Sequence, residues 1–207
     1  MTAPTVVTQD ITVQLDATGN VTITPAQIDN GSSDNCTTTS TLNITSFSCF
    51  DVGQNAVLLT VTDLSGNSTT ESAVVTVQDL IAPTAVTQDI TIQLDANGQA
   101  VISAADIDNG SSDNCGIQSL SIDKFAFICS SVGPNTVTLT VTDIHGNTST
   151  ATATVTVEDP IAPTLTANDF TVYLDEEGAA SISLSDLNVL ATDNCEDDID
   201  IRIKKGA

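Results

Sequence analysis

The amino-acid sequence predicts an all-β protein made of tandem immunoglobulin-like β-sandwich repeats, each of about 80 residues. The first observation is self-similarity, which indicates a repeat architecture. The segment APTVVTQDITVQLDATGNVTI begins at Ala3, and close copies of it begin at Ala82 and Ala162. The second observation is strict alternation of apolar and polar residues, and the third is a polar content dominated by Thr, Ser and Asn beside many Val and Ile residues. Both favour strands and turns over helices.

Strands and turns can be assigned in chain order within each repeat. In the first predicted strand, Ile11, Val13 and Leu15 face one side while the residues between them face the other. Residues 137–141 and 151–157 of the second repeat show the same alternation. Turns are predicted at DATG and DANG after the first strand, and at DLSGN and DIHGN before the last. Single helical turns are expected near PAQI and AADI.

The repeats predict three domains, at residues 1–80, 81–160 and 161–207. The third copy contains only the first half of a repeat, so we expect the chain to come from a longer array. The linkers QDLIAPT and EDPIAPT are short, apolar in the middle and contain proline, which predicts stiff connections. Because tandem units contact mainly their neighbours, we expect a monomeric rod.

Charge and hydropathy restrict the partners. The chain has 27 acidic and 4 basic residues and a formal net charge of -23. Nucleic acids and anionic membrane surfaces require Lys and Arg, so we expect neither as a partner. No apolar run is long enough to span a membrane, so no membrane insertion is expected. No basic region followed by an apolar one is visible at the start, so any export signal is expected outside this sequence.

An acidic segment that ends in cysteine, named here the knot, recurs in each repeat. It reads DNGSSDNC at Asp29–Cys36 and at Asp108–Cys115, and LATDNC at Leu190–Cys195. Cys49 and Cys129 follow the first two knots by 13 and 14 residues. This matched spacing predicts disulfides Cys36–Cys49 and Cys115–Cys129 within the repeats, with Cys195 free. Such disulfides indicate an oxidising, exported location; the alternative is reduced cysteines packed as small apolar residues.

Several carboxylates recur in both whole repeats and are expected at one pole. The hairpin turn and the knot should share the pole that faces the preceding repeat. There Asp79, Asp108, Asp113 and Asp143 would meet. Residues 1–80 contain no Lys or Arg, so unpaired carboxylates would repel, and a hard cation would relieve that repulsion. The sequence therefore predicts a calcium site at the repeat junction. The alternative is that Asp108 and Asp113 only accept hydrogen bonds from backbone amides.

The ordered set of motifs resembles a known repeat type. The segments DxIAPT, QDITxQLDA, DIDNGSSDNC and VTLTVTDxxGN together are similar to the HYR-like, immunoglobulin-like repeats of giant cell-surface adhesins of the SprB type from gliding Bacteroidetes. The resemblance covers the whole chain, and only the third knot departs from the pattern. It implies export by a type IX secretion system, an extracellular location on the cell surface, and a role in gliding motility or surface attachment.

Three classes of function are weighed against these observations. An enzyme would need a non-repeating constellation, whereas the acids recur in every repeat and His145 is the only histidine, so we expect no catalysis. A calcium-dependent carbohydrate-binding module, or an accessory module of a secreted enzyme, is the alternative, although aromatic residues are few. We expect structural stalk repeats that hold a distal binding tip. Their partners would be neighbouring repeats, gliding or secretion machinery, and extracellular surfaces or glycans.

Overall fold

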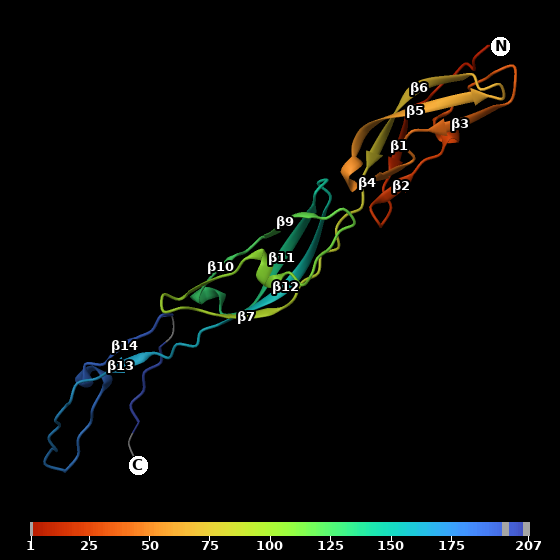
Figure 1. The fold of residues 1–207 in the computed structure, drawn as a ribbon. Helices are drawn as coiled ribbons and strands as arrows, with labels where there is room; N and C mark the ends of the chain where they lie inside the picture. The colour runs from red at the N-terminus through yellow and green to blue at the C-terminus, as the bar shows by residue number, and fades with distance from the viewer. Residues whose placement is uncertain (1, 196–198, 205–207) are drawn as a thin grey trace. The chain divides into compact units, whose positions relative to one another are not determined.

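A computed structural model of the chain describes residues 2–195 and 199–204 (Figure 1). The all-β, immunoglobulin-like fold is confirmed. The strands are β1 (Ile11–Gln14), β2 (Asn20–Thr22), β3 (Thr38–Leu42), β4 (Ser46–Ser48), β5 (Gly53–Asp63), β6 (Ser68–Gln78), β7 (Ile90–Gln93), β8 (Gln99–Val101), β9 (Ile117–Ile122), β10 (Ala126–Ile128), β11 (Gly133–Asp143), β12 (Thr148–Glu158), β13 (Thr164–Thr166) and β14 (Leu190–Thr192). Short helical turns are α1 (Pro25–Ile28), α2 (Ala104–Ile107), η1 (Cys49–Asp51), η2 (Cys129–Ser131) and η3 (Leu184–Leu187).

The first repeat contains two sheets with immunoglobulin-like connectivity. One sheet has the order β1-β6-β5-β3, and the other consists of β2 and β4. Strands β5 and β6 form an antiparallel hairpin of 11 residues each, and β1 runs parallel to β6. The third, fifth and sixth strands thus share one sheet, and the second and fourth pair in the other, as in immunoglobulin domains. Strands β5 and β6, with 11 residues each, connect one pole of the repeat with the other.

The second repeat has the same connectivity. Its larger sheet has the order β7-β12-β11-β9, and β8 pairs with β10. The parallel pairing of β12 with β7 reproduces that of β6 with β1. In the third repeat the described strands β13 and β14 pair antiparallel. Equal sequence patterns therefore give equal strand registers.

The core of the first repeat consists of the side chains that the alternation places on one face of each strand. In β5 these are Val57, Leu59 and Val61, all fully buried, and β6 contributes the same apolar alternation. The short helix α1 adds Ile28, which is also fully buried. Pro25 begins α1, at a position where its fixed φ suits the helix and no N–H is needed. Apolar burial between the two sheets is the main stabilising term.

The chain divides into two compact units that do not follow the repeat boundaries. The first unit is drawn from Met1–Val86, Asn109–Ser121 and Thr140–Ala151. The second is drawn from Thr87–Asp108, Ile122–Leu139 and Thr152–Ala207. The knot and hairpin turn of the second repeat therefore belong to the same compact unit as the whole first repeat. The domain boundaries at residues 80 and 160 stay a prediction.

No helix in the described part of the chain is long and apolar enough to cross a membrane.

Replacing Leu59 by Ala should destabilise the first repeat by about 2–5 kcal/mol, because it removes a fully buried side chain and leaves a cavity. Leu58 is the matched control, since it is the same residue type one position earlier and is exposed. Denaturant unfolding followed by circular dichroism measures both variants. Equal destabilisation by Leu58→Ala and Leu59→Ala would contradict the assignment of the core.

Candidate functional site at the repeat junction

The disulfides connect neighbouring repeats. Cys49 of the first repeat is bonded to Cys115 of the second, and Cys129 is bonded to Cys195 of the third. Both pairs have a Cα–Cα distance of 5.4 Å and a sequence separation of 66 residues. Cys36 is free and exposed. The predicted pairs Cys36–Cys49 and Cys115–Cys129 are therefore wrong, and so is the prediction that Cys195 is free.

The reason is the path of the chain between the two cysteines of one repeat. Cys36 precedes β3, whose first residue, Thr38, pairs with Asp63 at the hairpin turn. Strands β3 and β4 then run in the same direction, and Cys49 follows β4 at the opposite pole. Strand β5 connects the same poles with 11 residues, roughly 33 Å at about 3.3 Å per residue. Disulfides need Cα atoms within about 7 Å, so the two cysteines of one repeat cannot meet.

A glycine in the turn after the first strand makes room for the neighbouring repeat. The Asp16 carboxylate accepts hydrogen bonds from the backbone N–H groups of Thr18 and Asn20, which shapes the turn. Gly19 follows with a positive φ of 73°. A Cβ atom there would lie 2.6 Å from Cys49 Sγ and 2.9 Å from the carbonyl oxygen of Asn114. The backbone of the second knot thus lies directly against this turn.

The same close approach recurs in the second unit. A Cβ atom on Gly98 would lie 2.6 Å from Cys129 Sγ and 2.9 Å from the carbonyl oxygen of Asn194. In the third repeat, Gly178 has the same turn conformation with a φ of 76°. Among the described residues, no atom lies within 4 Å of a Cβ built on Gly178. The turn glycine is therefore crowded where the next knot docks.

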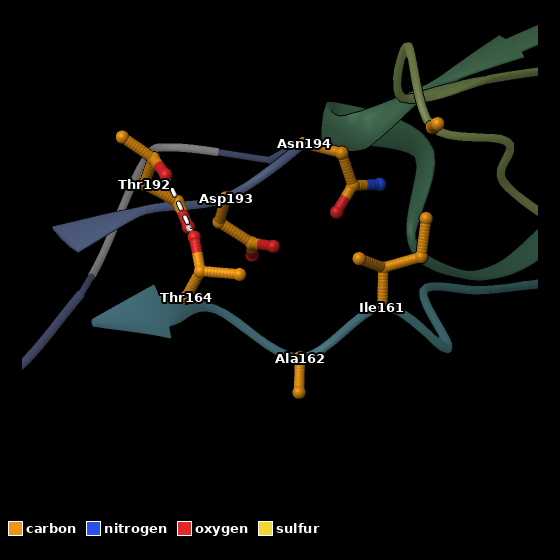
Figure 2. Close-up of a pocket in the computed structure, with 7 residues that line it drawn as sticks. Ile161, Ala162, Thr164, Thr192, Asp193 and Asn194 are labelled. Carbon is orange, nitrogen blue, oxygen red and sulfur yellow. Dashed lines mark hydrogen bonds between the residues drawn. The ribbon is translucent and has the colours of Figure 1, made fainter. Parts of the chain in front are cut away.

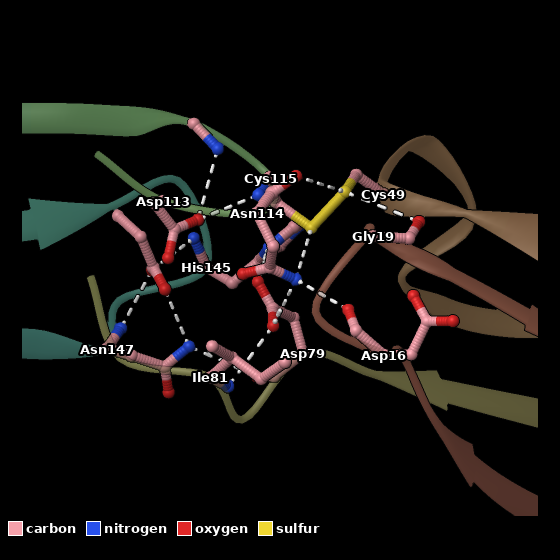
Figure 3. A network of polar contacts seen from close by, with 12 residues as sticks. Asp16, Gly19, Cys49, Asp79, Ile81, Asp113, Asn114, Cys115, His145 and Asn147 are labelled. Atoms are coloured by element: carbon pink, nitrogen blue, oxygen red, sulfur yellow. Dashed lines mark hydrogen bonds and ion pairs between the residues drawn. A yellow bond between two sulfur atoms is a disulfide. The ribbon is translucent and has the colours of Figure 1, made fainter. Parts of the chain in front are cut away.

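The asparagine of each knot crosses the repeat boundary with its side chain. Asn114 Nδ2 lies 3.3 Å from the carbonyl oxygen of Asp16 and 3.3 Å from Asp79 Oδ1 (Figure 3). Asn194 Nδ2 makes the equivalent bonds, at 3.2 Å to the Asp95 carbonyl oxygen and 3.1 Å to Asp159 Oδ1. One amide thus binds both the turn and the last carboxylate of the preceding repeat.

Asp79 links the first repeat to the hairpin turn of the second. Its side chain is fully buried, and its Oδ2 lies 2.9 Å from His145 Nδ1. The backbone N–H of Ile81 donates to its Oδ1. Asn147 Nδ2 donates to the Asp79 carbonyl oxygen at 3.2 Å. Sequence reasoning assigned Asp79 to this junction but missed Asn114, His145 and Asn147.

Asp143 is fully buried and opens the hairpin turn of the second repeat. It accepts hydrogen bonds from the backbone N–H groups of His145 and Asn147 and from Asn147 Nδ2. Burial raises the pKa of the Asp143 carboxyl, but these hydrogen bonds outweigh burial and hold the pKa below its usual value. Asp63 opens the equivalent turn of the first repeat, and hydrogen bonds, chiefly from the Asn67 side chain, lower its pKa. Both carboxylates are therefore ionised at neutral pH.

Three of the four predicted metal ligands meet at the junction. One carboxylate oxygen each from Asp79, Asp113 and Asp143 lies within 4.8 Å of the other two. The prediction that knot and hairpin turn share the pole facing the preceding repeat is thereby confirmed. Asp108 belongs to the other compact unit and is not a member of this group. Its copy in the first repeat, Asp29, accepts the backbone N–H of Ser32, which is a turn-forming role.

The third knot contains oxygen atoms without hydrogen-bond donors. In the third knot, Asp193 Oδ1 and Asn194 Oδ1 are buried and have no hydrogen-bond partner within the described part of the chain. In the second knot, the other terminal atom of the Asn114 amide lies 3.2 Å from Asp113 Oδ1. When the amide is turned over, this atom is the nitrogen, and it donates to Asp113 Oδ1. Buried acceptors without donors are unfavourable unless a cation or a water molecule satisfies them.

A small cavity opens beside each of these knots. In the second unit it has a volume of about 260 Å³ and is lined by Ile161, Asp193 and Asn194 among others (Figure 2). Thr164 and Thr192 close one side of it with a hydroxyl–hydroxyl hydrogen bond of 2.8 Å. The equivalent cavity in the first unit measures about 290 Å³ and is lined by Ile81, Asp113 and Asn114 among others. Asp193 and Asn194, whose buried oxygens have no hydrogen-bond partner among the described residues, are thus among the residues that line one of these cavities.

Comparisons with known proteins give the following similarities. No protein-family model and no curated protein sequence matches this chain. Among solved structures, human CDH23 EC21-23 is 14% identical, with a TM-score of 0.45, over 93% of this chain and 80% of its own. Human protocadherin-24 EC1-2 is 12% identical, with a TM-score of 0.42, over 78% of this chain and 100% of its own. Human mucin-like protocadherin EC1-2 is 15% identical, with a TM-score of 0.39, over 75% of this chain and 98% of its own.

Replacing Gly19 by Ala should disrupt the junction, because the new methyl group collides with Cys49 Sγ and with the backbone of Asn114. Gly178→Ala is the matched control. This substitution also places a Cβ atom on a residue with positive φ, which costs about 1–2 kcal/mol of stability, but the new methyl group collides with no described atom. We expect a larger fall in melting temperature for Gly19→Ala and incomplete formation of the Cys49–Cys115 disulfide. Equal effects of the two substitutions would show that the turn matters only for its own conformation.

Proposed function

We propose that this chain consists of structural stalk repeats of a large secreted cell-surface adhesin that displays a distal binding tip. The observation that carries this proposal is the disulfide across each described junction. Linker residues 79–83 and the Cys49–Cys115 bond give the first repeat and the knot of the second two covalent connections. A load that pulls on one repeat is then shared between both connections. Such reinforcement suits a protein that transmits force rather than one that turns over a substrate.

The proposed location and partners follow from the same features together with the sequence resemblance. Disulfides form and persist in oxidising surroundings, which supports an extracellular site. The resemblance to repeats of gliding adhesins supports display on the cell surface by a type IX system and a role in gliding motility or surface attachment. The partners proposed are neighbouring repeats of the same chain, the gliding or secretion machinery, and extracellular surfaces or glycans.

Labelling of intact cells that produce this protein tests the proposal. Antibodies raised against residues 2–195 should label the outside of unpermeabilised cells, and gold particles in electron micrographs should lie along extensions from the surface. A periplasmic protein of the same cells serves as the control for leakage. Labelling that appears only after permeabilisation would contradict the proposal.

We also propose that calcium binds at the junction. The ligands would be carboxylate oxygens of Asp79, Asp113 and Asp143 together with the amide oxygen of Asn114. Oxygen donors of this kind suit Ca²⁺, which takes carboxylates, amide carbonyls and water. The support is the close approach of three carboxylates, two of them buried. Bound calcium would neutralise their repulsion and hold knot, hairpin turn and linker together.

Calcium should stabilise the metal-stripped chain and release or absorb heat on titration. A ligand at a hundred times its dissociation constant adds about 2.7 kcal/mol to the free energy of unfolding. EDTA should reverse the rise in melting temperature. Asp113→Asn should weaken the effect, because the variant loses one charge while an oxygen remains to accept the N–H groups of Cys115 and Gly116.

Asp34→Asn is the matched control for Asp113→Asn. Asp34 occupies the same position in the first knot, where its carboxylate accepts the N–H of Cys36, but it is not part of the junction group. We expect this variant to bind calcium as the unchanged chain does. The absence of heat and of any thermal shift at millimolar calcium would leave the knot as a turn that carries a cysteine.

A further inference from the structure

The first knot has the same local structure as the second, although none of the described residues forms a junction with it. The N–H of Cys36 donates to Asp34 Oδ2 at 2.9 Å, and the N–H of Cys115 donates to Asp113 Oδ2 at 2.8 Å. Equivalent bridges join Thr5 to Ser33 and Thr84 to Ser112. The knot is thus formed in the same way whether or not a neighbour is docked against it.

The difference between the knots is the exposure of their last residues. Asn35 and Cys36 are exposed, whereas Asn114 and Cys115 are half-buried against the first repeat. In the third knot, Asn194 and Cys195 are half-buried against the turn and the cysteine of the second repeat. The Asp-Asn-Cys segment that ends the knot therefore binds the preceding repeat in the second and third copies. In the first copy, the asparagine and cysteine of the same segment are exposed to solvent.

We propose that the knot of the first repeat is a docking site for a further repeat of this type joined directly before Ala3. Cys36 forms a disulfide with the cysteine of that repeat that corresponds to Cys49 and Cys129. Asn35 then donates to the carbonyl oxygen and the carboxylate that correspond to those of Asp16 and Asp79. This inference rests on the proposed stalk function and extends it. Every junction of the array would then contain the same disulfide, between a knot cysteine and a cysteine of the preceding repeat.

A preceding repeat of the same chain fits this site better than a second molecule does. In both described junctions the bound carboxylate, that of Asp79 or Asp159, lies directly before the linker that continues into the docked repeat. The residues Ala3, Pro4 and Thr5 correspond to the last three residues of these linkers, Ala82–Thr84 and Ala162–Thr164. The binding surface is therefore complete only where a linker runs into the repeat that carries the knot.

The bond forms by thiol–disulfide exchange with a small disulfide such as oxidised glutathione. The thiolate of one cysteine attacks the glutathione disulfide and releases one glutathione thiolate. The second cysteine thiolate then attacks the resulting mixed disulfide and releases the other glutathione thiolate. The two cysteine thiols lose two protons and two electrons, and one oxidised glutathione becomes two glutathione molecules.

The test uses the full chain extended by one repeat. Residues 82–161 are placed directly before Ala3, so that the added linker reads EDPIAPT as in the natural junction. The protein is oxidised with a glutathione mixture, remaining thiols are alkylated, and disulfide-linked peptides are identified by mass spectrometry without reduction. The original Cys129 is bonded to Cys195, so a Cys36–Cys129 link that forms while the Cys129–Cys195 link is retained comes from the new junction.

We expect a Cys36–Cys129 link and complete loss of alkylation at Cys36. Half of the Cys115 peptides should be alkylated, because the Cys115 of the added repeat has no preceding repeat to bond to, whereas the original Cys115 stays bonded to Cys49. The unextended chain should instead be alkylated at Cys36. Asn35→Ala in the extended chain should slow formation of the link, whereas Asn43→Ala, outside the knot, should not. A Cys36 that stays alkylatable, pairs with Cys49 or forms dimers through Cys36 would overturn the inference. If Cys49–Cys115 persists in that case, the stalk proposal stands.

Discussion

The disulfide that crosses each repeat boundary is the interaction on which the junction depends. Cys49 and Cys115 come from different repeats, so the bond forms only when knot and turn lie in direct contact. In the chain-entropy description, a closed loop of 66 residues raises the free energy of unfolding by roughly 4 kcal/mol. Two local features permit the contact: the missing Cβ of Gly19 and the amide of Asn114. The compact first unit therefore extends past the linker into the second repeat.

The electrostatics of the junction follow from this contact. Docking of the knot brings Asp113 next to the buried carboxylates of Asp79 and Asp143, in a chain with very few cations. The His145 ring contacts one of these carboxylates, with Nδ1 2.9 Å from Asp79 Oδ2. In the first repeat the equivalent position is Ser65, so this histidine is specific to the second repeat. The close approach of these three carboxylates is the reason for proposing calcium at the junction.

The sequence predicted the fold and part of the site for identifiable physical reasons. Strand alternation determines which face is buried, so the core positions such as Leu139 and Val141 were predictable. The shared pole of knot and hairpin turn followed from strand direction. The cysteine pairing did not follow from the sequence in the same way. Only 13 or 14 residues separate the two cysteines of one repeat, but the chain between them runs from one pole to the other, so a short sequence separation does not mean a short distance. The identical separation of 66 residues in both true pairs, against 13 and 14 within repeats, was the available signal. A second sequence signal for the junction was the asparagine that precedes the cysteine in every knot.

Disulfide mapping of the native chain tests the central claim most directly. The oxidised protein is alkylated, digested without reduction and analysed by mass spectrometry, with a reduced sample as the control. The account predicts the links Cys49–Cys115 and Cys129–Cys195, with alkylation at Cys36 alone. The links Cys36–Cys49 and Cys115–Cys129, with alkylation at Cys195, would contradict it.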